Sequence, residues 1–231
     1  MPEMKAPSDK LLRRVAWLLL GVAVYVPAAF LLSMLTYAKP YVWYDQYLSA
    51  LGLIRLPDGS PNTIASWLLF NSALVVAGLG SAAYFLVRGW DYATTTPSHT
   101  WFRRIRGGLL GVFGVAGGIG LVMIGLIPYD CNPDWHNYST YVALAGLGPA
   151  VVLCIFSPCG RFANCAVSLS WSAVAMLVGA VLCAMRDLAI KGQLLRHGPC
   201  QQKLLVLGFY LFIVTHAILL FQNTSRHSCQ R

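Results

Sequence analysis

Charged side chains are scarce in this sequence, and acidic ones are the scarcest. Only 11% of the 231 residues are charged and eight are Asp or Glu, whereas about 25% of the residues in an average soluble domain are charged. Hydrophobic residues make up 57% of the chain. A soluble protein of this length cannot bury so much apolar surface. The sequence therefore predicts an all-α, polytopic membrane protein for which lipid is the solvent.

Several motifs that mark common protein classes are also missing. The sequence has no serine-triad pattern, no phosphate-cradling glycine loop, no C-x-x-C pair and no paired haem-ligand histidines, and it points to no particular cofactor. The net charge of +9 does not predict nucleic-acid binding, because Lys and Arg lie between apolar runs instead of on one face. Membrane lipids are the partners that this composition favours, and a protein partner or a homo-oligomer is compatible with it.

Long apolar runs dominate what is present. A membrane-spanning helix needs about 20 apolar residues, and the short alternating strands of a membrane barrel are not seen. The sequence predicts one domain built as a bundle of six transmembrane helices. None of these spans contains Asp or Glu, which argues against a proton-coupled pump of the usual kind. The expected spans are residues 15–37, 63–87, 107–127, 139–156, 166–185 and 204–221.

The distribution of Lys and Arg predicts the orientation. With the N-terminus inside, 11 of the 17 basic residues fall on the cytoplasmic side and six on the other. The positive-inside bias then favours cytoplasmic N- and C-termini. Residues 39–62, 129–138 and 187–203 would form the segments outside the cytoplasm.

The expected loop at residues 129–138 contains most of the side chains that could do chemistry. Asp130 and His136, with Asp45 from the first outer segment, could act as general base and acid. Asp130, Asp134 and His136 could instead bind a divalent metal. The competing interpretation is that these residues cap helices and fix the loop by hydrogen bonds.

Two polar residues lie inside expected spans. Asn71 and His216 are costly to place in lipid and should face the interior of the bundle, so they are candidate ligand-binding residues. They could approach one another across the bundle. The alternative for a buried histidine is a satisfied structural donor.

Two of the seven cysteines, Cys131 and Cys200, fall in expected outer segments. An oxidising compartment could join them in a disulfide that ties the third helix to the sixth. The alternative is two unpaired thiols.

Small residues predict where helices pack closely. Gly114 and Gly118 have G-x-x-x-G spacing in the third expected span, and such faces let helix backbones approach. This face should pack inside the bundle, with a dimer interface as the alternative.

Short motifs in the first half of the chain resemble those of a prokaryotic family of six-helix membrane proteins with no established activity. Residues 47–52 (Y-L-S-A-L-G), followed by P-N at 61–62, F-N at 70–71 and Gly78, resemble its I-S-(D/E)-L-G … P-N … F-N … G pattern. Residues 125–130 (G-L-I-P-Y-D) with His136 resemble its G-(I/L)-F-P-x-D … H segment. The eukaryotic DRAM-type membrane proteins have a comparable layout and are more distant.

The resemblance covers about residues 44–144 and implies a six-helix bundle with a site at the outer face. It implies Ser49, Asn71, Asp130 and His136 as the residues of that site. Ala50 stands at the acidic position of the first motif, so a role for that carboxylate would fall to Asp45. The resemblance brings no established reaction with it.

Three functions remain open from the sequence. The favoured one is a lipid-binding or scaffold membrane protein with a polar site at its extracytoplasmic face. The second is a membrane enzyme that acts on lipid headgroups through Asp130 and His136. The third is a small-solute transporter that uses Asn71 and His216.

Overall fold

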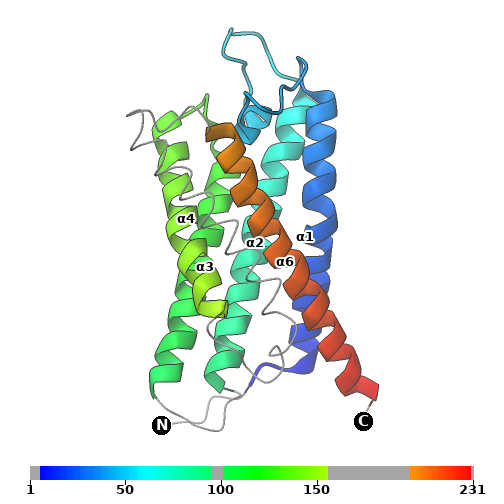
Figure 1. Ribbon diagram of the computed structural model, residues 1–231, viewed down its shortest axis with the longest axis vertical. Coiled ribbons are helices and arrows are strands. Elements are labelled where there is room, and N and C mark those ends of the chain that lie inside the picture. Colours follow the sequence, from blue (N-terminus) through cyan, green and yellow to red (C-terminus); the bar gives the residue numbers. More distant parts are fainter. Residues whose placement is uncertain (1–5, 95–100, 156–197, 230–231) are drawn as a thin grey trace.

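The computed structural model describes residues 6–94, 101–155 and 198–229, and this part of the chain is helical apart from its loops (Figure 1). Five of the helices in this part are long and apolar enough to cross a membrane, so the chain is an all-α, multi-pass membrane protein. The expected span at 166–185 lies outside the described residues. The elements are α1 (Asp9–Thr36), η1 (Leu48–Gly52), α2 (Ile64–Thr94), α3 (Trp101–Leu126), α4 (Pro133–Ile155) and α6 (Gly198–Cys229).

α1, α3, α4 and α6 begin before the apolar runs that predict them, and α2 and α6 end beyond theirs. α1 begins at Asp9 because the Ser8 hydroxyl accepts the Leu11 backbone N–H at 3.3 Å and so caps the helix. α2 continues to Thr94, seven residues beyond its expected end at Val87. The extension brings Asp91 into the helix, where it is buried. The expected span at 63–87 contains no Asp or Glu, but the helix that extends it carries Asp91.

α4 begins at Pro133, inside the expected outer loop. The Asn132 side chain accepts the backbone N–H of Trp135 at 3.1 Å, and a proline favours the first helical position. Asp134 and His136 therefore lie in the first turn of a helix. The connection between α3 and α4 is correspondingly short.

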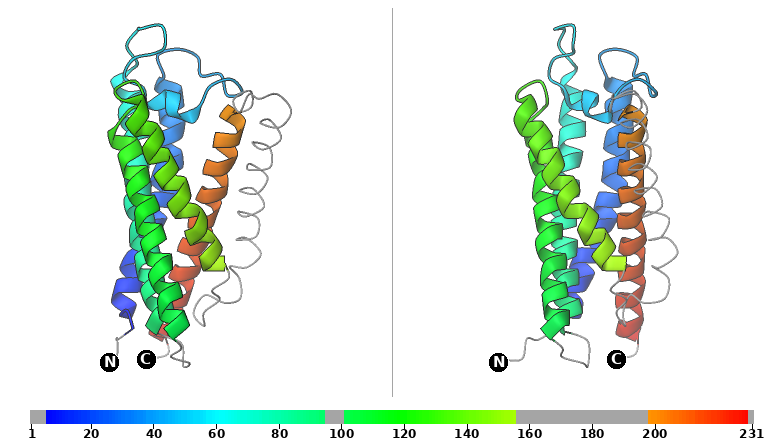
Figure 2. Two further views of the ribbon diagram at one scale, coloured as in Figure 1. Left: turned by 90° about the vertical axis from the view of Figure 1, so that its left-hand side faces the viewer. Right: turned by 60° about the vertical axis from the view of Figure 1, so that its left-hand side comes forward.

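Successive helices from α1 to α4 run in opposite directions along the bundle, and α6 runs in the same direction as α2 and α4 (Figure 1). Figure 2 shows α3 and α4 on one side of α2 and α1 and α6 on the other, in agreement with the pairs of helices that contact each other. α1 begins and α6 ends at the same end of the bundle, here called the terminal end (Figure 1). Residues 37–63, here called the cap, cover the opposite end together with the α3–α4 connection.

Glycines bring α3 close to both of its neighbours. A Cβ added to Gly118 would lie 2.6 Å from the Gly78 carbonyl oxygen of α2, and one added to Gly120 would lie 2.4 Å from the Ala143 backbone nitrogen of α4. Such contacts let helices pack when no hydrophobic force drives them together. Packing of the glycine face inside the bundle is confirmed.

The cap is folded by local turns, and its last residue is the N-cap of α2. Arg55 and Pro61 form an isolated antiparallel bridge, and Gly59 takes a φ of 83° in the turn between them. The Thr63 hydroxyl then accepts the Ser66 backbone N–H at 3.1 Å, so Thr63 is the N-cap of α2.

Candidate functional site

The short helix η1 is held by polar side chains that project from α2 and its entry. η1 carries unpaired carbonyls at its end, as every short helix does. Three side chains, which come from α2 and the residue before its N-cap, donate hydrogen bonds there, and all three are buried. Asn62 donates to the Leu51 and Leu53 carbonyls at 3.2 and 2.8 Å, Ser66 donates to Leu51 at 3.1 Å, and Asn71 donates to Gly52 at 3.0 Å.

Asp130 reaches the same segment from the α3–α4 connection. Its carboxylate accepts the Arg55 backbone N–H at 2.8 Å and the Ile54 backbone N–H at 3.1 Å. A carboxylate that accepts two backbone N–H groups makes charge-assisted hydrogen bonds, which are stronger than neutral ones. Asp130 therefore joins the α3–α4 connection to the cap.

His136 fastens the same connection to the end of α3. Its Nδ1 lies 2.8 Å from the Ile127 carbonyl oxygen. Because a carbonyl only accepts, Nδ1 carries the proton and donates. The His136 ring also meets the Tyr129 ring edge-on, with 5.6 Å between centroids, and the residue is buried. This histidine closes the turn between α3 and α4.

The start of α6 supplies a third attachment to the cap, which the sequence did not indicate. The Gln202 side chain accepts the Leu48 backbone N–H at 2.7 Å. The Lys203 ammonium donates to the Gln46 carbonyl at 2.6 Å and to the Trp43 carbonyl. It also lies 5.1 Å from the centroid of the Trp43 ring, a cation–π distance. Lys203 is buried, although its charge alone predicted a solvated loop.

The remaining outer residues predicted from sequence are exposed or partly exposed. Asp45 and Asp134 are exposed, and Ser49 is half-buried in η1. Cys131 is exposed, Cys200 is partly exposed, and both are free thiols in the structure.

Within residues 6–94, 101–155 and 198–229, no three His, Cys, Asp or Glu side chains are grouped so that they could hold a metal ion. The predicted set of Asp130, Asp134 and His136 is therefore not assembled as a metal centre. Of the residues that the resemblance implies, Asn71 and Asp130 contact the same cap segment, while His136 bonds to α3.

Two partly buried tyrosines and one ion-paired carboxyl of the cap have shifted pKa values. Burial and, second, the neighbouring Tyr37 raise the pKa of Tyr41, whose hydroxyl donates to the Gln46 carbonyl at 3.0 Å. Burial also raises the pKa of Tyr37. The Lys39 ammonium, bonded to Asp58, lowers the pKa of that carboxyl.

Asn71 and His216, which could have met, belong to different parts of the molecule. Asn71 bonds to the cap, whereas His216 contacts Tyr84 and Cys154 near the terminal end. Asn71 and Tyr84 are about 20 Å apart along α2 at 1.5 Å per residue. The structure therefore separates the two residues that a transporter would have combined.

The cluster around His216 joins three helices. Tyr84 of α2, Cys154 of α4 and His216 of α6, here called the inner cluster, are all buried. The Tyr84 hydroxyl lies 3.5 Å from Cys154 Sγ, and Sγ lies 4.0 Å from His216 Nε2. Only His216 was predicted as a functional residue; Cys154 carries no sequence signal, because its partners are distant in the chain.

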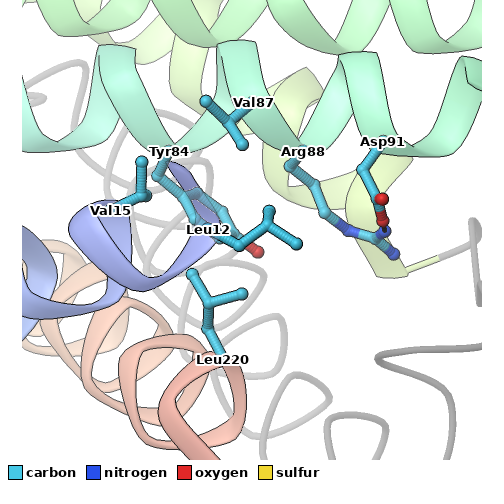
Figure 3. Close-up of a pocket in the computed structure, with 7 residues that line it drawn as sticks. All are labelled: Leu12, Val15, Tyr84, Val87, Arg88, Asp91 and Leu220. Carbon is cyan, nitrogen blue, oxygen red and sulfur yellow. Dashed lines mark ion pairs between the residues drawn. The ribbon is translucent and has the colours of Figure 1, made fainter. Parts of the chain in front are cut away.

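A small cavity adjoins Tyr84 of the inner cluster, on the side toward the terminal end. Figure 3 shows the Tyr84 ring on its wall, with Arg88 and Asp91 side by side on the same helix. Arg88 Nη1 lies 3.7 Å from Asp91 Oδ2, and both side chains are almost fully buried. The sequence placed Arg88 in a cytoplasmic loop, because the apolar run ends before it. The other lining residues are Leu12, Val15, Val87 and Leu220.

Comparison of the whole chain with protein-family models, curated proteins and solved structures finds no match. The class of protein that the fold defines is thus a multi-pass helical membrane protein. The resemblance to the prokaryotic six-helix family stays a prediction.

Proposed function

We propose that this chain is a non-enzymatic, lipid-binding membrane protein whose cap is a preformed surface at the extracytoplasmic face. The observation that carries the proposal is the use of the polar side chains beneath the cap. Asp130, Asn71 and His136 each bond to backbone groups of the protein itself. They hold a surface in one conformation and leave no assembled group of base, acid or metal ligands.

Exposed aromatic rings around this end supply the contact with lipid. Aromatic side chains favour the headgroup level of a bilayer, where one edge of the ring is wet and the other is apolar. Tyr44 of the cap is 76% exposed, and Trp135 and Tyr138 at the start of α4 are 55% and 61% exposed. Rings fixed on a rigid surface lose little freedom when they bind, which favours affinity.

The opposite end of the bundle supports the proposed orientation. α1 and α3 begin there with a concentration of basic residues, and Trp101 and Phe102 are exposed beside them. A basic end with aromatic neighbours favours the cytoplasmic leaflet and its anionic headgroups. We therefore place both termini in the cytoplasm and the cap outside it. The basic residues are Lys10, Arg13, Arg14, Arg103, Arg104 and Arg106.

Native mass spectrometry of the protein released from nanodiscs tests the proposal. Replacing Tyr44, Trp135 and Tyr138 together by alanine should reduce the number of retained phospholipids without lowering the unfolding temperature. The matched control is Val24→Ala, which removes an exposed side chain (72%) from the lipid-facing surface of α1. Equal lipid retention by the triple variant and the control would refute binding through the cap.

A second measurement separates this function from a lipid enzyme. Wild-type protein incubated with phospholipid vesicles should leave the headgroup composition unchanged. Headgroup turnover that disappears in Asp130→Asn, with folding retained, would show that the enzyme interpretation is right and the proposal wrong.

A further inference from the structure

We propose that the inner cluster is a binding site for a monovalent soft metal ion, Cu⁺, with Cys154 Sγ and His216 Nε2 as its two ligands. This site is independent of the cap and of lipid binding. It concerns three helices that meet near the terminal end of the bundle.

The hydrogen bond on the far side of the imidazole prepares His216 as a ligand. Nδ1 lies 2.8 Å from the Phe212 carbonyl oxygen of the preceding helical turn, so Nδ1 carries the proton and donates it to that bond. The lone pair then lies on Nε2, the atom that faces Cys154. The Phe212 ring lies 4.0 Å from the His216 ring, centroid to centroid, and fixes its orientation. Metal-binding histidines almost always donate their other ring N–H to a carboxylate, a backbone carbonyl or a water, and the Phe212 carbonyl takes that role here.

The spacing between the two ligand atoms suits an ion between them. Sγ and Nε2 are 4.0 Å apart. Bonds to a d¹⁰ ion are about 2.3 Å from sulfur and about 2.1 Å from imidazole nitrogen. A separation of 4.0 Å is therefore compatible with bonds from both atoms to one ion at a wide S–metal–N angle.

The net charge of the ion together with its two ligands determines which ion suits this buried site. Cys154 and His216 are 6% and 3% exposed, inside helices long and apolar enough to cross the membrane. An uncompensated charge is costly there. A Cu⁺ ion bound to one thiolate and one neutral imidazole forms a neutral unit, whereas Zn²⁺ on the same ligands leaves a net positive charge. Thiolate ligands also favour Cu⁺, and the Sγ–H proton is released as the metal–sulfur bond forms.

Tyr84 gives the site an outer partner and links it to the cavity. Its hydroxyl lies 3.5 Å from Sγ, so it can donate to a metal-bound thiolate and hold it in place. The same side chain lines the cavity with Arg88 and Leu220, toward the terminal end (Figure 3). Neither Cys154 nor His216 lines the cavity, so Tyr84 stands between the cavity and the two ligand atoms.

The test uses the full-length chain in detergent, without oxygen, and Cu⁺ buffered by a chromogenic chelator. To exclude the other thiols, the parent variant keeps Cys154 and replaces Cys131, Cys159, Cys165, Cys183, Cys200 and Cys229 by serine. This parent should bind one Cu⁺ per chain. X-ray absorption should show one sulfur and one nitrogen neighbour.

Cys154→Ser and His216→Gln in this parent should each weaken Cu⁺ binding at least about 100-fold, because even outer partners are worth about 10–100-fold. Tyr84→Phe should weaken it about tenfold on the same basis. Binding that is unaffected by Cys154→Ser, or a parent that unfolds normally and binds no Cu⁺, would overturn the site. Preference for Zn²⁺ over Cu⁺ would also overturn it, because the assignment depends on neutrality.

Discussion

Asp130 and Arg55 are separated by 75 positions in the chain, yet the Asp130 carboxylate accepts the Arg55 backbone N–H at 2.8 Å. This bond ties the α3–α4 connection to the cap. Together with the bonds from Asn71 and Gln202, it attaches the cap to three different helices or their ends. The cap is thus a tertiary structure, although it is one continuous loop in the sequence.

Asp130→Ala should lower the free energy of unfolding by about 1.5–3 kcal/mol, because hydrogen bonds to a charged group contribute about that much. Thermal unfolding in detergent, followed by tryptophan fluorescence, measures the effect. Asp134→Ala is the matched control, since Asp134 is exposed and interacts chiefly with the dipole of α4; it should cost less than about 1 kcal/mol. Equal effects of the two substitutions would contradict the role assigned to Asp130.

Lys203→Met keeps the length of the side chain and removes the donor to the Trp43 and Gln46 carbonyls. Residues 42–47 should then open more often. Hydrogen–deuterium exchange there should accelerate about tenfold or more, from the loss of about 1.5 kcal/mol or more. The control is Lys39→Met, whose side chain is 52% exposed in its ion pair with Asp58, and exposed pairs contribute little. Unchanged exchange in Lys203→Met would show that the attachment does not restrain the cap.

Gly118→Ala and Gly108→Ala are the same substitution on the same helix with opposite expected results. The Cβ at residue 118 would lie 2.6 Å from the Gly78 carbonyl oxygen, whereas nothing lies within 4 Å of one at residue 108. The first should destabilise the protein by about 1–3 kcal/mol through overpacking. The second should be neutral or stabilising by up to about 1 kcal/mol, because alanine favours helix. A similar unfolding temperature for both variants would argue against close contact of α2 and α3.

Alkaline pH should loosen the cap through Tyr41. Burial raises the pKa of this phenol, and its proton is donated to the Gln46 carbonyl. A raised pKa in the folded state means that the contribution to stability is complete below the unfolded value, about 10, and is lost as pH rises above it. The unfolding temperature should therefore fall above pH ~10, and fall less in Tyr41→Phe. Parallel pH profiles for wild type and Tyr41→Phe would assign the effect to other groups.

The sequence predicted the positions of the described helices, because a run of apolar residues long enough to span a bilayer is typical of a transmembrane helix. It predicted their ends poorly, since polar residues such as Asp91 continue a helix past its apolar core. The start of α4 has a sequence signal, because Asn132 is a typical N-cap residue and Pro133 is typical of the first position of a helix. Hydropathy concealed this signal because the first turn of α4 is polar.

Contacts between residues that lie far apart in the chain could not be predicted from one sequence. Asp130 and His136 were correctly placed at the same end as the cap, but the backbone groups that they bind depend on how three segments meet. Cys154 shows the limit most clearly. It lies in an apolar run with no local pattern, and only the packing of α4 against α6 brings it to His216.

The bonds from Gln202 and Lys203 to the cap also have a consequence for biosynthesis. The ribosome completes residues 37–63 long before it makes the start of α6, so the cap acquires these bonds only after α6 has been made. A chain truncated before residue 202 would carry a cap without this support, with the Trp43 and Gln46 carbonyls lacking their lysine. The order of synthesis therefore leaves the cap without these bonds until α6 has been made and has packed against it.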